Sequence, residues 1–244
     1  MTTNQTSGRR GLVWAIVGGL ILIAGIVAIV VSSLLAQPAP DPNGSDSPPP
    51  ADPTSTAEPT MGEVVDASVA DQGWLAEPIT ADRDLYIRAA LEAAATFDTE
   101  KSTREEWLDY LDTWFTPDTR YTSEADQRAA MTDSQGLLRQ AVVLPQEEWD
   151  SLANEDGRVV AAATGDVVYV QVTDDASGDM SIGTSDVAVT FTRSDGSGGQ
   201  TAYEEQVRAS VQVLCGPGSV PTPDSAQRAG DCKVVRYFTE PLEP

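Results

Sequence analysis

Residues 11–35 (GLVWAIVGGLILIAGIVAIVVSSLL) form an apolar run without a single charge. As a helix, at about 1.5 Å per residue, the run exceeds the roughly 30 Å hydrocarbon core of a bilayer, so it predicts one transmembrane helix. A cleaved signal peptide is the alternative, but its apolar core is normally about 7–15 residues long. Ala36 leaves room for a signal peptidase, and we favour retention of the helix.

The charges on either side of this run predict its orientation. Arg9 and Arg10 precede it, whereas residues 37–60 carry acids and no basic residue. Because basic residues flank the cytoplasmic end of a span, residues 1–10 are expected to be a cytoplasmic tail. The sequence therefore predicts a single-pass cell-membrane protein with an extracytoplasmic C-terminal domain.

A proline-rich segment follows the predicted span. Residues 37–60 (QPAPDPNGSDSPPPADPTSTAEPT) contain almost no apolar side chains. Such a segment cannot bury a core and is expected to be extended, partly as polyproline II. Residues 61–79 are transitional, and Trp74 is expected to pack on the folded body. We therefore assign residues 36–73 to a disordered linker with its transitional segment, and residues 74–244 to the folded domain.

The folded domain begins with helical patterns. Apolar spacing over residues 80–98 predicts a first helix, with Thr80 as its N-cap. A capping-box pair, Ser102 and Glu105, predicts the start of a second helix. Ser123 predicts the start of a shorter third one. The second helix carries one apolar stripe, formed by Trp107, Leu108, Leu111, Trp114 and Phe115.

Further along the chain the apolar period changes to two, which predicts strands. The clearest strand covers residues 203–215, and residues 195–199 (DGSGG) predict a turn before it. Residues 232–239 predict a last strand, with Val234 and Phe238 on one face. Strands joined by short turns form an antiparallel meander, and helices must cover one of its faces. The sequence therefore predicts an α+β fold, with about three helices packed on four or five antiparallel strands.

Residues 89–118 (AALEAAATFDTEKSTREEWLDYLDTWFTPD) combine an alanine-rich helix with a W-x-x-x-L helix that ends in Thr-Pro. Together with the single span, the proline-rich stalk and the order of elements, this pattern resembles two groups of proteins from high-GC Gram-positive bacteria. One comprises the bitopic scaffold proteins of conjugation and type IV secretion systems, and the other the Mce-associated membrane proteins. The resemblance implies a cone-shaped, nuclear-transport-factor-like domain, and it carries over no site residue.

The only two cysteines, Cys215 and Cys232, lie at the end and the beginning of consecutive predicted strands. Outside the cytoplasm such a pair is expected to form a disulfide, here closing the loop between the two strands. A redox-active pair would need the close Cys-x-x-Cys type of spacing, which this pair lacks.

The sequence contains no histidine. This excludes Ser-His-Asp and Cys-His nucleophile pairs and histidine-ligated zinc. The acidic stretch 174–186 fits a calcium loop only in part, because Met180 stands where the turn needs glycine. We expect no metal, no cofactor and no enzymatic activity, although a carboxylate pair needs no histidine. Glu204 and Glu205 are interpreted as residues of a solvated face.

Charge indicates the class of partner. Residues 1–36 carry two positive charges and residues 37–60 four negative ones, so residues 61–244 carry −21 of the net charge of −23. Such a surface repels nucleic acid and anionic headgroups, and we expect no nucleic-acid partner. Membrane contact is expected through the chain's own helix. Other envelope proteins with basic surfaces are the expected partners, and a homo-oligomer is left open.

Two functions remain open at this point. The first is a scaffold or interaction domain of an envelope machine such as a conjugation or secretion apparatus. The alternative is a ligand-binding or carboxylate-based enzymatic domain with an apolar pocket for a lipid or cell-wall fragment. Trp107, Trp114 and Phe115 are the candidate lining of such a pocket, and at helical spacing they fit a core as well.

Overall fold

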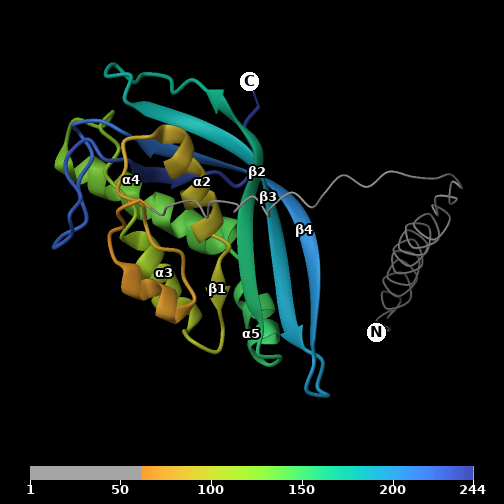
Figure 1. Ribbon diagram of the computed structural model, residues 1–244. Helices are drawn as coiled ribbons and strands as arrows, with labels where there is room; N and C mark the ends of the chain where they lie inside the picture. Colours follow the sequence, from red (N-terminus) through yellow and green to blue (C-terminus); the bar gives the residue numbers. More distant parts are fainter. Residues whose placement is uncertain (1–61, 244) are drawn as a thin grey trace, which may run out of the picture. The chain divides into compact units, whose positions relative to one another are not determined.

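The computed structural model describes residues 62–243. Helices pack on one face of a curled antiparallel sheet of five strands, in the order β1-β2-β3-β4-β5 (Figure 1). The predicted α+β class and meander are confirmed. The predicted cytoplasmic tail, the span at 11–35 and most of the linker lie outside the described residues. Within residues 62–243, no helix is both long enough and apolar enough to cross a membrane.

The strands lengthen toward the middle of the sheet. They are β1 (Phe97–Asp98), β2 (Arg158–Val170), β3 (Met180–Ser194), β4 (Gln200–Leu214) and β5 (Lys233–Tyr237). The predicted turn at 195–199 joins β3 to β4. In β2 the pairing with β3 shifts between Thr164 and Val168, where Gly165 has a φ of 70°. Such a bulge strengthens the local twist of a strand and so helps to curl the sheet.

The helices are more numerous than the pattern predicts. They are the 3-10 helix η1 (Ala67–Gln72), α2 (Arg83–Ala93), α3 (Arg104–Asp112), α4 (Glu124–Leu137), the π turn η2 (Leu138–Val142) and α5 (Gln146–Ala153). The predicted N-cap Ser123 is confirmed for α4, which runs further than expected. The helix α5 follows Pro145 without a side-chain cap, so no capping signal marks its start.

Two predicted caps are wrong, because other contacts occupy the residues concerned. The cap of α2 is Asp82, since Thr80 is still extended and its carbonyl accepts from the Cys232 amide at 2.7 Å. The capping box of α3 uses Thr103 and Glu106. The hydroxyl of Ser102 accepts instead from the Trp74 indole at 2.8 Å.

The folded body begins before residue 74. Val64 forms a bridge with Pro78, and the Val65 amide donates to the Glu77 carbonyl at 2.9 Å. In η1, Val69 is buried. Part of the segment that composition assigns to the linker therefore belongs to the fold.

Aromatic side chains fill the space between the helices and the sheet. Phe97, Trp107 and Trp149 pack with ring centroids 4.1–5.5 Å apart, and Trp114 packs against Tyr86 at 5.9 Å. Both Trp107 and Trp114 are fully enclosed. Such rings contribute large apolar areas to a core, and here they fill the space under the curled sheet.

The two ends of β5 face opposite sides of the sheet. Val234 belongs to the main core, whereas Phe238 packs on a smaller cluster on the other face, around Leu214 and Val235. The pairing of β4 with β5 shifts between Gln212 and Val213. An extra residue in one strand reverses the alternation beyond it, so the prediction of one shared face for Val234 and Phe238 is wrong.

Candidate functional site

Chemistry-bearing side chains gather at two places, and the first is closed. Lys233 Nζ lies 2.8 Å from Glu77 Oε1, and the two residues are 1% and 0% exposed. The same ammonium donates to the Thr113 carbonyl at 2.8 Å and to Thr222 Oγ1 at 2.7 Å. The Tyr86 hydroxyl donates to Glu77 Oε1 at 2.5 Å. We call these residues the Glu77–Lys233 cluster.

Burial dominates the electrostatics of this cluster. It lowers the pKa of Lys233, and the Glu77 carboxylate opposes that shift. Burial also raises the pKa of Tyr86 well above its usual range, and the charge of Glu77 adds to the rise. A buried ion pair whose hydrogen bonds are all made is stable but unavailable to a substrate. The cluster therefore holds the fold together and is not a reactive site.

A disulfide lies beside this cluster. Cys215 and Cys232 are bonded, as predicted, and no free cysteine remains in the chain. Cys232 directly precedes Lys233, and its amide donates to the Thr80 carbonyl. The disulfide thus fixes the start of β5 to the end of β4, and the ion pair and the Cys232 amide fix it to the segment that leads into α2.

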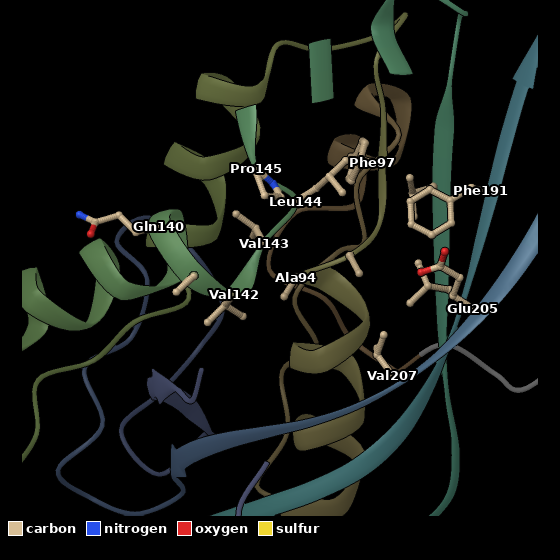
Figure 2. Close-up of a pocket in the computed structure, with 14 residues that line it drawn as sticks. Ala94, Phe97, Gln140, Val142, Val143, Leu144, Pro145, Phe191, Glu205 and Val207 are labelled. Carbon is tan, nitrogen blue, oxygen red and sulfur yellow. The ribbon is translucent and has the colours of Figure 1, made fainter. Parts of the chain in front are cut away.

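The second place is an open apolar groove between the sheet and the segment that follows α4. Figure 2 shows Val142, Val143 and Leu144 on one side of it, and Phe191, Glu205 and Val207 on the other. Its cavity volume is about 340 Å³. The remaining lining consists of Ala94, Ala95, Phe97, Gln140, Ala141, Pro145, Val159 and Val189.

The groove continues toward α5. A second hollow of about 260 Å³ shares Leu144, Phe191 and Glu205 with the first and adds Glu148 and Tyr203 to the lining. The rings of Phe191 and Tyr203 stack with centroids 4.9 Å apart across β3 and β4. The two hollows therefore form one surface along the concave side of the β3–β4 hairpin, which we call the β4 groove.

Two arginines fix the helical wall of the groove. Arg104 donates to the Leu144 carbonyl at 3.1 Å and to the Arg139 carbonyl at 3.0 Å. Arg139 in turn forms ion pairs with Asp112 at 2.6 Å and Asp109 at 3.2 Å on α3. The π turn η2 ends in this wall, and such turns occur often at functional sites. The wall is thus held in place without a ligand.

The groove borders an open strand edge. Strand β5 pairs only with residues 211–214 of β4. The Phe238 amide donates to the Ser210 carbonyl at 3.1 Å, so the backbone groups of Ser210 point away from β3. Because these groups alternate along a strand, those of Ala202, Glu204 and Gln206 point the same way. Among the described residues, no strand pairs with them, and this edge resembles those to which proteins add strands.

One carboxylate stands on the groove side of this edge. Alternation places Tyr203, Glu205 and Val207 on the concave face, and Glu204 on the opposite one. Glu205 is exposed, and within the part of the chain that the structure describes no cation lies close enough to form an ion pair with it. The groove therefore combines an apolar floor with an acidic rim.

The expectation that Trp107, Trp114 and Phe115 line a pocket is not met by the β4 groove. All three are buried in the core: Trp107 packs on Trp149 of α5, and Trp114 and Phe115, just after α3, pack against Tyr86 and Tyr237. Phe97, Phe191 and Tyr203 are the aromatic residues that line the groove instead. The period-two pattern of 203–215 contains the signal for Glu205, which falls on the apolar face of that strand.

The described fold is similar to that of two solved proteins, although the sequence itself has no match. No family model matches the sequence, and no curated protein matches it. An IcmL-like type IV secretion system protein from Legionella pneumophila is 13% identical, with a TM-score of 0.40 over 67% of this chain and 95% of that one. CagV, a VirB8 homolog of the type IV secretion system of Helicobacter pylori, is 13% identical, with a TM-score of 0.33 over 63% and 93%.

Both neighbours belong to type IV secretion systems, one of the kinds of machine to which the resemblance of residues 89–118 points. At these TM-scores the similarity does not decide what the chain does.

Proposed function

We propose that this chain is a membrane-anchored scaffold protein whose extracytoplasmic domain docks another protein in the β4 groove, within an envelope machine such as a conjugation or secretion apparatus. One observation carries the proposal: a preformed apolar groove lies beside an unpaired strand edge. Domains that recognise extended peptides combine these two features, since the edge supplies main-chain hydrogen bonds and the groove holds alternate side chains.

The state of the carboxylates favours docking over catalysis. Carboxylate catalysis needs a pair of acids whose surroundings separate their pKa values. The two acids of the groove, Glu148 and Glu205, are both exposed to solvent. Glu77, which pairs with Lys233, is enclosed in the core, where no substrate can reach it.

A small apolar ligand is the second candidate. The volume of about 340 Å³ and the apolar lining of the first hollow fit the lower end of small-molecule pockets. A lipid chain or the apolar part of a cell-wall fragment would then occupy the space between Val142 and Val207. This occupant would make no use of the backbone edge of β4.

Photocrosslinking in intact cells distinguishes the two candidates. The full chain would carry a photoreactive amino acid at Val207 in the groove or, as a control, at Val160. Both are exposed valines of the sheet, but Val160 lies on the opposite face, between the core residues Val159 and Ala161. We expect a discrete protein adduct from Val207 and none from Val160.

Other outcomes of this experiment are informative. A lipid adduct at Val207 would favour the ligand-binding candidate. If neither Val207 nor a further exposed site such as Tyr121 gave a protein adduct, the scaffold proposal would be contradicted.

A further inference from the structure

We infer that the occupant of the β4 groove is an extended segment of a partner protein, which adds a strand to β4 along residues 202–206 and places a lysine or arginine against Glu205. This inference rests on the proposed docking function and specifies the chemistry of the docked segment. Three features of the described residues support it: the direction of the backbone groups, the alternation of side chains and the charge of the rim.

The backbone of β4 presents a regular set of hydrogen-bonding groups. Pairing with β3 is uninterrupted from Gln200 to Leu214, so the alternation read from Ser210 holds along the strand. The amides and carbonyls of Ala202, Glu204 and Gln206 therefore form a ladder that β3 does not use. An added strand would satisfy these groups, just as the Phe238 amide satisfies the Ser210 carbonyl.

The side chains of an added strand would alternate between two environments. Those facing the groove would lie about 4.5–5.5 Å from Tyr203, Glu205 and Val207, within reach of Val142 and Leu144 on the other wall. Those on the opposite side would lie beside Glu204 and solvent. The docked segment therefore needs apolar residues at every second position and has no such requirement between them.

Charge selects the residue opposite Glu205. Among the described residues neither this carboxylate nor Glu148 forms an ion pair, because Arg193, which also lines the second hollow, pairs with Glu155. The surrounding domain is strongly negative. A lysine or arginine at one groove-facing position would pair with Glu205 over an apolar floor, where solvent screens the pair less than on an open surface.

The same charges exclude two other occupants. The chain's own residues 37–60 carry four acids and no base, so they would bring negative charge to an acidic rim. A second copy paired edge to edge through β4 would bring Glu204 and Glu205 next to their own counterparts, between two domains of charge −21. Like charges facing each other across strands are destabilising.

A synthetic probe tests the inference on the full chain in lipid nanodiscs. The probe is the labelled peptide acetyl-Val-Thr-Val-Thr-Lys-Thr-Val-Thr-Val-amide, which carries valines and the lysine on one face. A second peptide has Glu in place of Lys. Fluorescence anisotropy would give the affinity of each peptide for each variant.

One pair of variants tests the backbone step. Gln206→Pro removes an amide that points to the open edge, and Gln206→Ala removes the same side chain but keeps the amide. Proline is tolerated at such edge positions because the ladder with β3 does not use that N–H. We expect Gln206→Pro to weaken binding of the Lys peptide about tenfold and Gln206→Ala to change it less than about twofold.

A second pair tests the charge step. Glu205→Lys and Glu204→Lys change the net charge equally on opposite faces of the same strand. We expect Glu205→Lys to weaken the Lys peptide by about threefold to tenfold and to strengthen the Glu peptide, with a smaller effect from Glu204→Lys. Thermal unfolding monitored by circular dichroism would confirm that all four variants fold, and if Gln206→Pro did not, the charge pair would decide.

Several outcomes would overturn the inference. These are equal binding by Gln206→Pro and Gln206→Ala, equal effects of the two charge reversals, or a dimer of the chain that Gln206→Pro dissociates. If any of these were found while Val207 still crosslinked to a protein in cells, the docking function would stand and the added strand would be wrong. Loss of the crosslink itself would instead contradict the docking function.

Discussion

The Glu77–Lys233 cluster and the β4 groove each place a glutamate among apolar and aromatic side chains, but they differ in access. Glu77 is fully buried and receives hydrogen bonds from Tyr86 and Lys233. Glu205 is exposed, and within residues 62–243 it has no such partner and no strand pairs with the outer edge of β4 beside it. The comparison shows that enclosure, rather than residue type, separates a group that stabilises the fold from one that is free to meet another molecule.

The largest expected effect comes from removing the buried glutamate, and removal of the exposed one is its control. Glu77→Ala would leave the ammonium of Lys233 buried without its counter-ion, which costs about 3–5 kcal/mol. Glu205→Ala should change the free energy of unfolding by less than about 0.5 kcal/mol, because an exposed group loses nothing that water cannot replace. Urea unfolding of the full chain measures both. Similar losses at the two positions would contradict the distinction between closed and open sites.

The disulfide beside the Glu77–Lys233 cluster allows the stability of this region to be tested without changing a charge. Replacing both Cys215 and Cys232 by serine should lower the stability by about 3 kcal/mol, because the bond limits the entropy of the unfolded loop. Peptide binding at the groove should be unchanged at temperatures where the variant remains folded. Alkylation of the native, unreduced chain followed by mass measurement provides the control, since a modified thiol would show that the bond is absent.

Alkaline pH should lower the free energy of unfolding through the buried tyrosines around the Glu77–Lys233 cluster. Burial raises the pKa of Tyr86, Tyr110 and Tyr237 above the ordinary value, so the folded chain keeps protons that the unfolded chain releases near pH 10. Stability that is complete below pH 10 is therefore lost as the pH rises further. Burial lowers the pKa of Lys233, so its one proton makes the free energy of unfolding rise with pH and partly offsets the loss from the tyrosines.

The expected loss is at most about 1.4 kcal/mol per pH unit for each net proton. Unfolding measured between pH 8 and pH 11 would show the slope, and Tyr237→Phe should reduce it by about one proton. A free energy of unfolding that stays constant over this range would contradict the assignment.

The smallest expected effect concerns the wall of the groove. Arg139→Ala removes the ion pairs with Asp109 and Asp112 and should lower the stability by about 1 kcal/mol. Hydrogen exchange should become faster in residues 138–145, and peptide binding should weaken, because the wall of the groove is then less ordered. Arg128→Ala is the control, since its ion pair with Glu124 is exposed and distant from the groove. Equal exchange in the two variants would show that Arg139 does not position the wall.

The fold class was accessible from the sequence because its determinants are local. Period-two alternation over 203–215 and the turn at 195–199 predict β4 and its hairpin, and the spacing of Cys215 and Cys232 predicts their bond. The short helix α5 was not accessible, since it has only Trp149 and Leu152 as buried residues and starts without a cap.

The site was accessible only in part. Alternation along β4 separates Glu205 from Glu204, but both were interpreted as residues of a solvated face, and the place of Glu205 beside the groove was missed. What makes the concave face of β4 a groove is the packing of residues 138–145 opposite it, a contact between segments about 60 residues apart that no local pattern encodes. The open edge depends on where β5 stops pairing with β4, which is at Tyr237, opposite Val211.

The ion pair between Glu77 and Lys233 joins residues that are 156 positions apart. Contacts of such separation form late, because the entropy of closing a long loop must be overcome first. Until the last strand has been synthesised, Glu77 lacks its counter-ion and cannot be buried at low cost. A chain that stops before Lys233 should therefore stay open and sensitive to proteases, so the final strand acts as a completeness check on the whole domain.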